Sequence, residues 1–522
     1  MEQLNNPFPD IKEGQLAVKD STDKNSPLFI KIRQNFGIYG GISLIFGVAF
    51  TLLFYKAGVG FNIFAFSCIM VLLLLLIMKK LSVPLKKGTI AYYLGTISLG
   101  LSSMLTSSWI LLFLNIIGIL LLLDLSLIHQ FNEDSNWNFS RKIGSMFVLP
   151  LVTITTIGMP FQDTFKYFKS TKLFKNDRFM NITTGIIIAV PLLWVIIGLL
   201  SSADLIFGKL TNEVYDLVFS SNIFTIVIMV IFGFLVCYCI ICGATMKAGS
   251  NDFIHERKKA SASIAVTVLL LLGIVYIMFC SVQVLYLFNN GVFVLPSEFT
   301  YAEYARRGFF ELLAVTVINI VLMLICTSFF EESKFVRILL TAMTACTYIM
   351  IASAVYRMIL YISAYNLTFL RLFVLLFLLI DSLVLIGVIV SVYRKRFPLF
   401  GYSVCAVTIC YLIFSFARPD YFIAKYHIQE KENMEYTDIV YLTESLSFDA
   451  APVLIPYFKE KFPEIQFIPN ADNTEYYTDN HGKEEVIKNY YNRISSKEKE
   501  SGLREYNVSY SLAIKSLKSI EE

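Results

Sequence analysis

Long apolar blocks separated by short polar stretches dominate the chain from residue 36 to residue 416. A helix rises about 1.5 Å per residue and the hydrocarbon core of a bilayer is about 30 Å thick, so 11 of these blocks are long enough to cross. They cover residues 36–55, 61–78, 89–105, 109–129, 183–207, 223–245, 262–288, 308–330, 338–361, 369–393 and 398–416. Backbone groups in hydrocarbon must bond within their own segment, and the alternating pattern of barrel strands is absent, so we expect helices.

A further block, residues 144–162, contains two prolines and a threonine-rich centre. Lysine and arginine near span ends favour the cytoplasmic side of a membrane. If the block does not cross, one side collects nearly all the basic loops and the other keeps only Lys56, Lys209 and the pair Arg306 and Arg307. If it crosses, three strongly basic loops fall outside. We therefore expect an interfacial or re-entrant segment, a cytoplasmic N-terminus and an extracytoplasmic C-terminus.

The two ends of the chain differ from this apolar middle. Residues 1–34 are polar and lack the basic region and apolar run of a cleavable signal peptide. The tail is polar, charged and rich in tyrosine, and within it Ser447-Phe-Asp449 before AAPVLIPYFKEKF predicts a capped helix. The predicted fold class is all-α: a polar cytoplasmic segment over 1–34, a polytopic transmembrane helix bundle over 35–416, and a small, mainly helical, extracytoplasmic domain over 417–522.

Composition agrees with a multipass protein of the cell membrane. The chain is 56% hydrophobic and 16% charged, whereas soluble domains carry about a quarter charged residues. The net charge of +4 is small, so composition gives no case for a nucleic-acid partner. All 9 cysteines fall in apolar blocks, which argues against a disulfide framework.

Signatures of catalysis and cofactor binding are missing from the sequence. It contains no GxxxxGK[ST] phosphate loop, no HExxH and no GxSxG. The 4 histidines are widely dispersed, which disfavours a metal site. In Cys237-Tyr-Cys-Ile-Ile-Cys242 the first cysteine points away from the other two on a helix, so we expect these side chains to pack as small hydrophobes. We therefore expect no enzyme activity, no cofactor and no metal.

Charged residues inside the spans are the more informative feature, because ionisable groups there are costly and are usually paired or functional. Thr300-Tyr-Ala-Glu303 is a capping box, so a helix is expected to begin at Thr300 and to place Arg307 and Glu311 on one face. Tyr361 and Tyr365 follow Arg357 at four-residue steps. Several such groups are expected to converge in the outer half of the bilayer: Asp204, Arg306, Arg307, Glu311, Arg357, Tyr361, Tyr365 and Arg371.

A cationic pocket at that depth would suit an anionic lipid headgroup, a phosphate or a carboxylate, because guanidinium groups bind such groups bidentately. The alternatives are that these charges pair with one another and lock helices together, or that the arginines extend to the interface. Asp381 lies near mid-membrane and is a weaker candidate for coupling to a proton or cation.

Several strings resemble an uncharacterised bacterial membrane family, domain of unknown function 4173, which is related to 4153. They are Ser202–Phe207, Tyr301–Phe310, Tyr356–Arg371, Arg418–Ile428, Tyr441–Pro452 and Arg504–Asn507. The resemblance covers roughly residues 180–515 and implies a multipass membrane protein, but it implies no activity and no site residues. In that family a glycine is expected where Asn366 stands.

Two classes of function remain open at this stage. The first is a protein that handles an anionic ligand or lipid, either as a transporter or as a binder; its arginines should line a cavity. The second is a non-catalytic envelope partner or sensor whose tail docks another envelope protein; its arginines should be paired with carboxylates. Besides the lipid bilayer itself, the expected partners are an anionic lipid, a small anion or an envelope protein.

Overall fold

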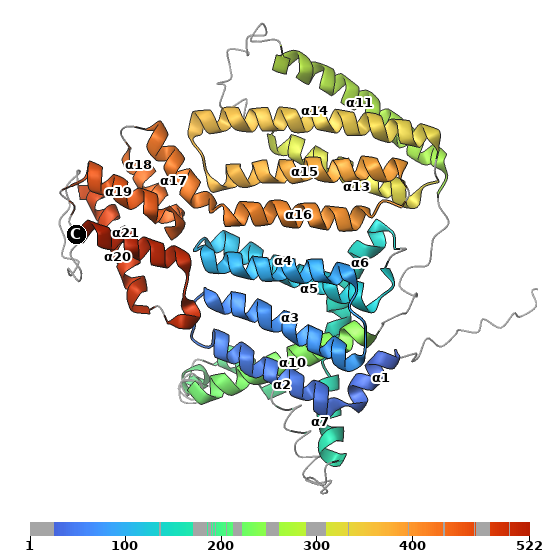
Figure 1. Ribbon diagram of the computed structural model, residues 1–522, viewed down its shortest axis with the longest axis vertical. Coiled ribbons are helices and arrows are strands. Elements are labelled where there is room, and N and C mark those ends of the chain that lie inside the picture. The colour runs from blue at the N-terminus through green and yellow to red at the C-terminus, as the bar shows by residue number, and fades with distance from the viewer. Residues whose placement is uncertain are drawn as a thin grey trace, which may run out of the picture.

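Helices are the regular elements of the part of the chain that the structure describes, with one isolated bridge between Ala260 and Phe330. The structure is a computed structural model, and it describes residues 26–134, 137–170, 195–204, 206–211, 222–246, 260–288, 309–331, 333–394, 396–431, 434–463, 465, 481–500 and 502–521, with isolated residues between 185 and 193. Long helices run side by side in one bundle, and a group of shorter C-terminal helices covers one end of it (Figure 1).

Nine helices of the described residues are long and apolar enough to cross a membrane. They are α2 (Phe36–Phe54), α3 (Phe61–Leu81), α5 (Trp109–Phe131), α10 (Asn222–Met246), α11 (Ala262–Phe288), α13 (Phe309–Phe329), α14 (Lys334–Tyr365), α15 (Phe369–Tyr393) and α16 (Leu399–Phe416). This agrees with an all-α membrane helix bundle.

The predicted total of 11 spans differs from these nine at two places. Helix α4 (Lys87–Leu105) has 19 residues and packs against both α3 and α5, but glycine, serine and threonine lower its hydropathy. The predicted span 183–207 falls largely outside the described residues. The exact count therefore stays a prediction.

The block predicted to be interfacial or re-entrant forms a bent helix pair. Helices α6 (Phe139–Thr155) and α7 (Met159–Ser170) meet at an angle of 44°. Near the start of α6, Lys142 lies 2.9 Å from Asp134, which follows α5. On α7, Asp163 lies 2.7 Å from Arg33 of α1 (Pro27–Gln34), which precedes α2. Both ends of the pair thus contact segments at the same end of the bundle, although the segment's relation to a membrane stays a prediction.

The bundle has two chemically different ends. At the α1 end lie α1, the start of α14 and the end of α15; at the α17 end lie the α4–α5 turn, the α14–α15 turn and the C-terminal helices (Figure 1). Most of the described basic residues that flank the long helices lie at the α1 end: Lys31, Arg33, Lys79, Lys80, Lys86, Lys87, Arg141, Lys142, Lys334, Arg337, Arg394 and Arg396. This asymmetry makes the α1 end the predicted cytoplasmic face.

Two groups of buried side chains hold the bundle. One joins α2, α3, α4, α5 and α10 and includes Phe46 and Tyr238; the other joins α11, α13, α14 and α15 and includes Met323 and Leu378. Helices α2 and α10 approach so closely that a Cβ on Gly47 would lie 2.3 Å from the carbonyl oxygen of Val230. Large apolar side chains cover the outside of the helices, as hydrocarbon contact requires.

The C-terminal helices pack around an apolar cluster of their own, which includes Ile439, Leu454 and Tyr490. They are α17 (Pro419–Glu430), α18 (Tyr436–Val440) with the π-turn Tyr441–Ser445, the short turn Phe448–Ala450 with α19 (Ala451–Lys461), α20 (His481–Glu500), and the turn Leu503–Glu505 with α21 (Val508–Glu521). Ser447 accepts a hydrogen bond from the backbone N–H of Asp449, as the sequence pattern predicts for a cap.

Candidate functional site

The turn between α14 and α15 brings together three of the predicted site residues. The Nη1 of Arg371 donates a hydrogen bond of 2.7 Å to the carbonyl oxygen of Tyr365 and another to that of Asn366. The guanidinium carbon lies 4.2 Å from the ring centroid of Tyr361 and 5.9 Å from that of Tyr365. Carbonyl bonds and ring stacking therefore fix the orientation of this cation.

Asn366 explains how the turn reaches this geometry. Its φ of 66° and ψ of 172° lie in a region that glycine occupies easily and other residues rarely. This is the position at which the family resemblance predicts glycine. Asparagine adopts this conformation here, and its carbonyl oxygen accepts a hydrogen bond from the Arg371 guanidinium.

Beside Arg371 lies a cavity of about 250 Å³, which we call the α13–α15 pocket. The start of α13, the end of α14 and the start of α15 form its walls. Its lining residues are Phe309, Phe310, Met358, Tyr361, Thr368, Leu370, Arg371 and Val374. Arg371 is the charged member of this lining, so the pocket combines one cation with aromatic and aliphatic walls.

Arg357 lies apart from this lining. It is buried, and its Nη2 donates a hydrogen bond of 3.3 Å to Oε1 of Gln283 on α11. The hydroxyl of Ser353 donates to the same oxygen at 2.6 Å. These contacts tie α14 to α11, so Arg357 supports the helix packing behind the pocket.

The carboxylates predicted for the site lie elsewhere. Asp204 is exposed, and its Oδ1 accepts hydrogen bonds of 2.8 Å from the backbone N–H groups of Ile206 and Phe207, so it caps its own turn. Glu311 is exposed in the first turn of α13. No contact of the described residues joins Asp204 or Glu311 to Arg371. Arg306 and Arg307 lie outside the described residues.

Asp381 is buried within the bundle, on α15. Its Oδ2 has no hydrogen-bond partner among the described atoms. The neighbouring backbone carbonyl of Ser382 accepts a hydrogen bond of 2.8 Å from the hydroxyl of Tyr348 on α14. The Asp381 carboxyl itself interacts with the Thr316 hydroxyl on α13, so Asp381 belongs to the α13–α15 contact, deeper in the bundle than the α13–α15 pocket.

A second polar cluster, which the sequence reasoning did not anticipate, seats the C-terminal helices on the bundle. The Asp449 carboxylate is buried and accepts hydrogen bonds from the Thr106 hydroxyl and, at 3.4 Å, from the Ser107 backbone N–H. The hydroxyls of Ser107 and Ser509 lie 2.8 Å apart. Asn507 donates a hydrogen bond of 2.8 Å to the Thr106 carbonyl oxygen. We call this cluster the tail seat.

Burial shapes the protonation equilibria in the tail seat. It raises the pKa of the Asp449 carboxyl and that of Asp420, which accepts a hydrogen bond from the Ser447 backbone N–H. Three strings that carry the family resemblance meet here, because Asp420, Asp449 and Asn507 each come from a different one. That shared origin was the only sequence signal for the cluster, since a polar residue of the tail gives no hint of what it contacts.

His427 links the C-terminal helices to the α14–α15 turn. Its Nε2 lies 2.8 Å from the Leu367 carbonyl oxygen and donates to it. Burial lowers the pKa of this imidazole below its ordinary value, which favours the neutral form. The C-terminal helices thus contact the segment that also positions Arg371.

Comparison with known proteins gives one result. The family described as "Domain of unknown function (DUF4153)" matches residues 93–457, which include the α14–α15 turn, the α13–α15 pocket and the Thr106, Ser107 and Asp449 members of the tail seat. The resemblance to the related family 4173 stays a prediction. The chain matches no curated protein and no solved structure. Because the match covers well over half of its 522 residues, the chain belongs to the DUF4153 family of integral membrane proteins, whose molecular function is unknown.

Proposed function

We propose that the protein binds an anionic amphiphile, with the charged headgroup at Arg371 and an acyl chain beside the α13–α15 pocket. The observation that carries this proposal is the coexistence of an oriented guanidinium and apolar walls in one cavity of about 250 Å³. Ligand pockets are typically apolar with a few placed polar groups, which is the composition found here.

The contacts of Arg371 support binding of an anion rather than helix locking. Its hydrogen bonds to the Tyr365 and Asn366 carbonyl oxygens both use Nη1, so no carboxylate compensates the positive charge in these contacts. A guanidinium also presents Nε and Nη2, in a fork that matches two phosphate oxygens. An anion at this edge would add charge-assisted hydrogen bonds.

The surroundings of the pocket support a lipid as the source of that anion. Phe310 and Leu370 belong to the lining and are 56% and 61% exposed, so they extend the apolar wall towards the outside of the bundle. A soluble anion would gain nothing from these side chains, whereas an acyl chain would bury them. If the ligand also crosses the membrane, Asp381 is the residue we propose for coupling.

Native mass spectrometry of the purified full-length protein tests the proposal. We expect an anionic phospholipid adduct on the wild type, its loss in Arg371→Ala, and a weaker adduct in Arg371→Lys, because an ammonium lacks the planar fork. Lys425→Ala is the matched control: it removes one exposed positive charge at the same end of the bundle, on α17.

The arms of the experiment separate the possible outcomes. Retention of the adduct by Arg371→Ala at the wild-type level would overturn the proposal. A delipidated sample incubated with inorganic phosphate distinguishes a small-anion site from a lipid site. Copurification of another envelope protein with no lipid adduct would favour the alternative role as a partner or sensor.

A further inference from the structure

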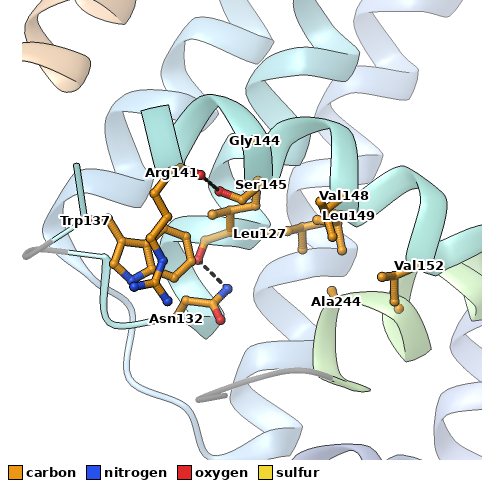
Figure 2. Close-up of a pocket in the computed structure, with 12 residues that line it drawn as sticks. Leu127, Asn132, Trp137, Arg141, Gly144, Ser145, Val148, Leu149, Val152 and Ala244 are labelled. Atoms are coloured by element: carbon orange, nitrogen blue, oxygen red, sulfur yellow. Dashed lines mark hydrogen bonds between the residues drawn. The ribbon is translucent and has the colours of Figure 1, made fainter. Parts of the chain in front are cut away.

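A second cavity, of about 100 Å³, lies at the opposite end of the bundle between α5, α6 and α10. We call it the α5–α6–α10 pocket. In Figure 2, Trp137, Arg141 and Asn132 gather at one end of it, whereas Val148, Leu149, Val152 and Ala244 line the other. The cavity therefore has a polar mouth and an apolar depth.

The polar mouth is cationic. The Arg141 guanidinium carbon lies 4.4 Å from the Trp137 ring centroid, so the ring holds the cation at the mouth. Arg141 and Lys142 both lie in the first turn of α6, where acidic residues are normally preferred and none is present. Arg141 is the charged residue of the pocket lining, whereas Lys142 lies outside the lining and 2.9 Å from Asp134.

The position of α6 makes the pocket accessible to lipid. Phe147 and Leu151 are 69% and 62% exposed on the face of α6 turned outward from the bundle. Gly243 and Ala244 form the α10 wall of the cavity, where α10 and α6 approach closely because Gly243 has no side chain. An aliphatic chain that follows α6 can therefore enter while its headgroup stays at Arg141.

We propose that the α5–α6–α10 pocket binds an anionic phospholipid of the leaflet at the α1 end, with the phosphate at Arg141 and the first methylenes of one chain against Val148 and Val152. Charge complementarity argues for an anionic rather than a zwitterionic lipid, because most of the described basic residues that flank the long helices lie at this end and basic pockets between helices favour such headgroups. This site is independent of Arg371.

Trp137 supplies a direct reporter for this site. The chain has 3 tryptophans, and in the double variant Trp109→Phe/Trp194→Phe the remaining one is Trp137. The full-length protein is reconstituted into two nanodisc samples, one with bromine-labelled phosphatidylglycerol and the other with the same fraction of bromine-labelled phosphatidylcholine. We expect the anionic label to quench Trp137 at least about twofold more strongly, because bromine quenches at contact distance.

Two variants and a control decide between the outcomes. Arg141→Ala should abolish the preference for the anionic label, and Val152→Phe should lower quenching by both labels while Arg141 is kept. Lys80→Ala, which removes another positive charge at the same end, should leave the preference intact. Equal quenching by both labels in the parent protein, or an unchanged preference in Arg141→Ala, would overturn the proposal. Loss of the preference on adding inorganic phosphate would assign the site to free phosphate instead.

Discussion

Replacing Asp449 by alanine is expected to loosen the C-terminal helices from the bundle. The change leaves the buried Thr106 hydroxyl and the Ser107 N–H without their acceptor. Hydrogen bonds to a charged group contribute about 1.5–3 kcal/mol, but the longer Ser107 contact is weaker and removal of the carboxylate relieves its desolvation. Taken together, these effects predict a loss of about 2–3 kcal/mol.

Hydrogen–deuterium exchange of the amides in α19 and α21 measures this loss. At about 1.4 kcal/mol per factor of ten, exchange should accelerate roughly 30- to 140-fold. Asp449→Asn should cost less than about 1 kcal/mol, because it keeps an acceptor for Thr106 and avoids burial of a charge.

Glu444→Ala is the matched control, since Glu444 is an exposed carboxylate of the same helices. We expect it to leave the exchange rates unchanged. If Asp449→Ala exchanges at the wild-type rate in both α19 and α21, the tail seat does not hold the C-terminal helices, and the reasoning from its hydrogen bonds is refuted.

Three further perturbations test other parts of the structure. Asn366→Gly should raise the unfolding free energy by about 1 kcal/mol in thermal denaturation, since glycine relieves the positive φ; a decrease would contradict this. Asp163→Ala should cost about 2–3 kcal/mol and speed amide exchange in α7, because the buried Tyr238 hydroxyl loses its acceptor and the partly exposed Arg33 loses its ion pair; unchanged exchange in α7 would argue against the pairing. Burial lowers the pKa of His427 in the folded protein below its ordinary value of 6.5, so stability that is present above pH 6.5 is lost as the pH falls from 6.5 through the pKa of the folded protein. His427→Gln should remove this part of the acid sensitivity, and identical profiles of stability against pH for the variant and the wild type would refute the reasoning.

The periodicity of apolar residues predicted the bundle well, because hydrocarbon allows few alternatives to a helix. It predicted α14 and α15 and placed Tyr361, Tyr365 and Arg371 on either side of the turn between them, since these residues are close in sequence. The predicted position of Asp204 beside the arginines is not supported in the same way. The depth of a residue along a span does not indicate which neighbouring helix its side chain faces, and in the structure the Asp204 carboxylate caps its own turn.

The tail seat likewise depends on contacts that the sequence pattern does not indicate. Asp449 was identified at a predicted helix start, but its contact with Thr106 joins residues 343 positions apart. No periodicity encodes such a pairing, because it depends on how the C-terminal helices sit on the bundle. The same helices reach the α14–α15 turn through His427, so the seat supports the segment that orients Arg371.

The most direct test of the account is an electron cryomicroscopy map of the full-length protein in nanodiscs that contain phosphatidylglycerol. We expect headgroup-sized density in the α13–α15 pocket, within hydrogen-bonding distance of Nε or Nη2 of Arg371, and the disappearance of that density in Arg371→Ala. A pocket without density, with Arg371 paired to a carboxylate, would contradict it.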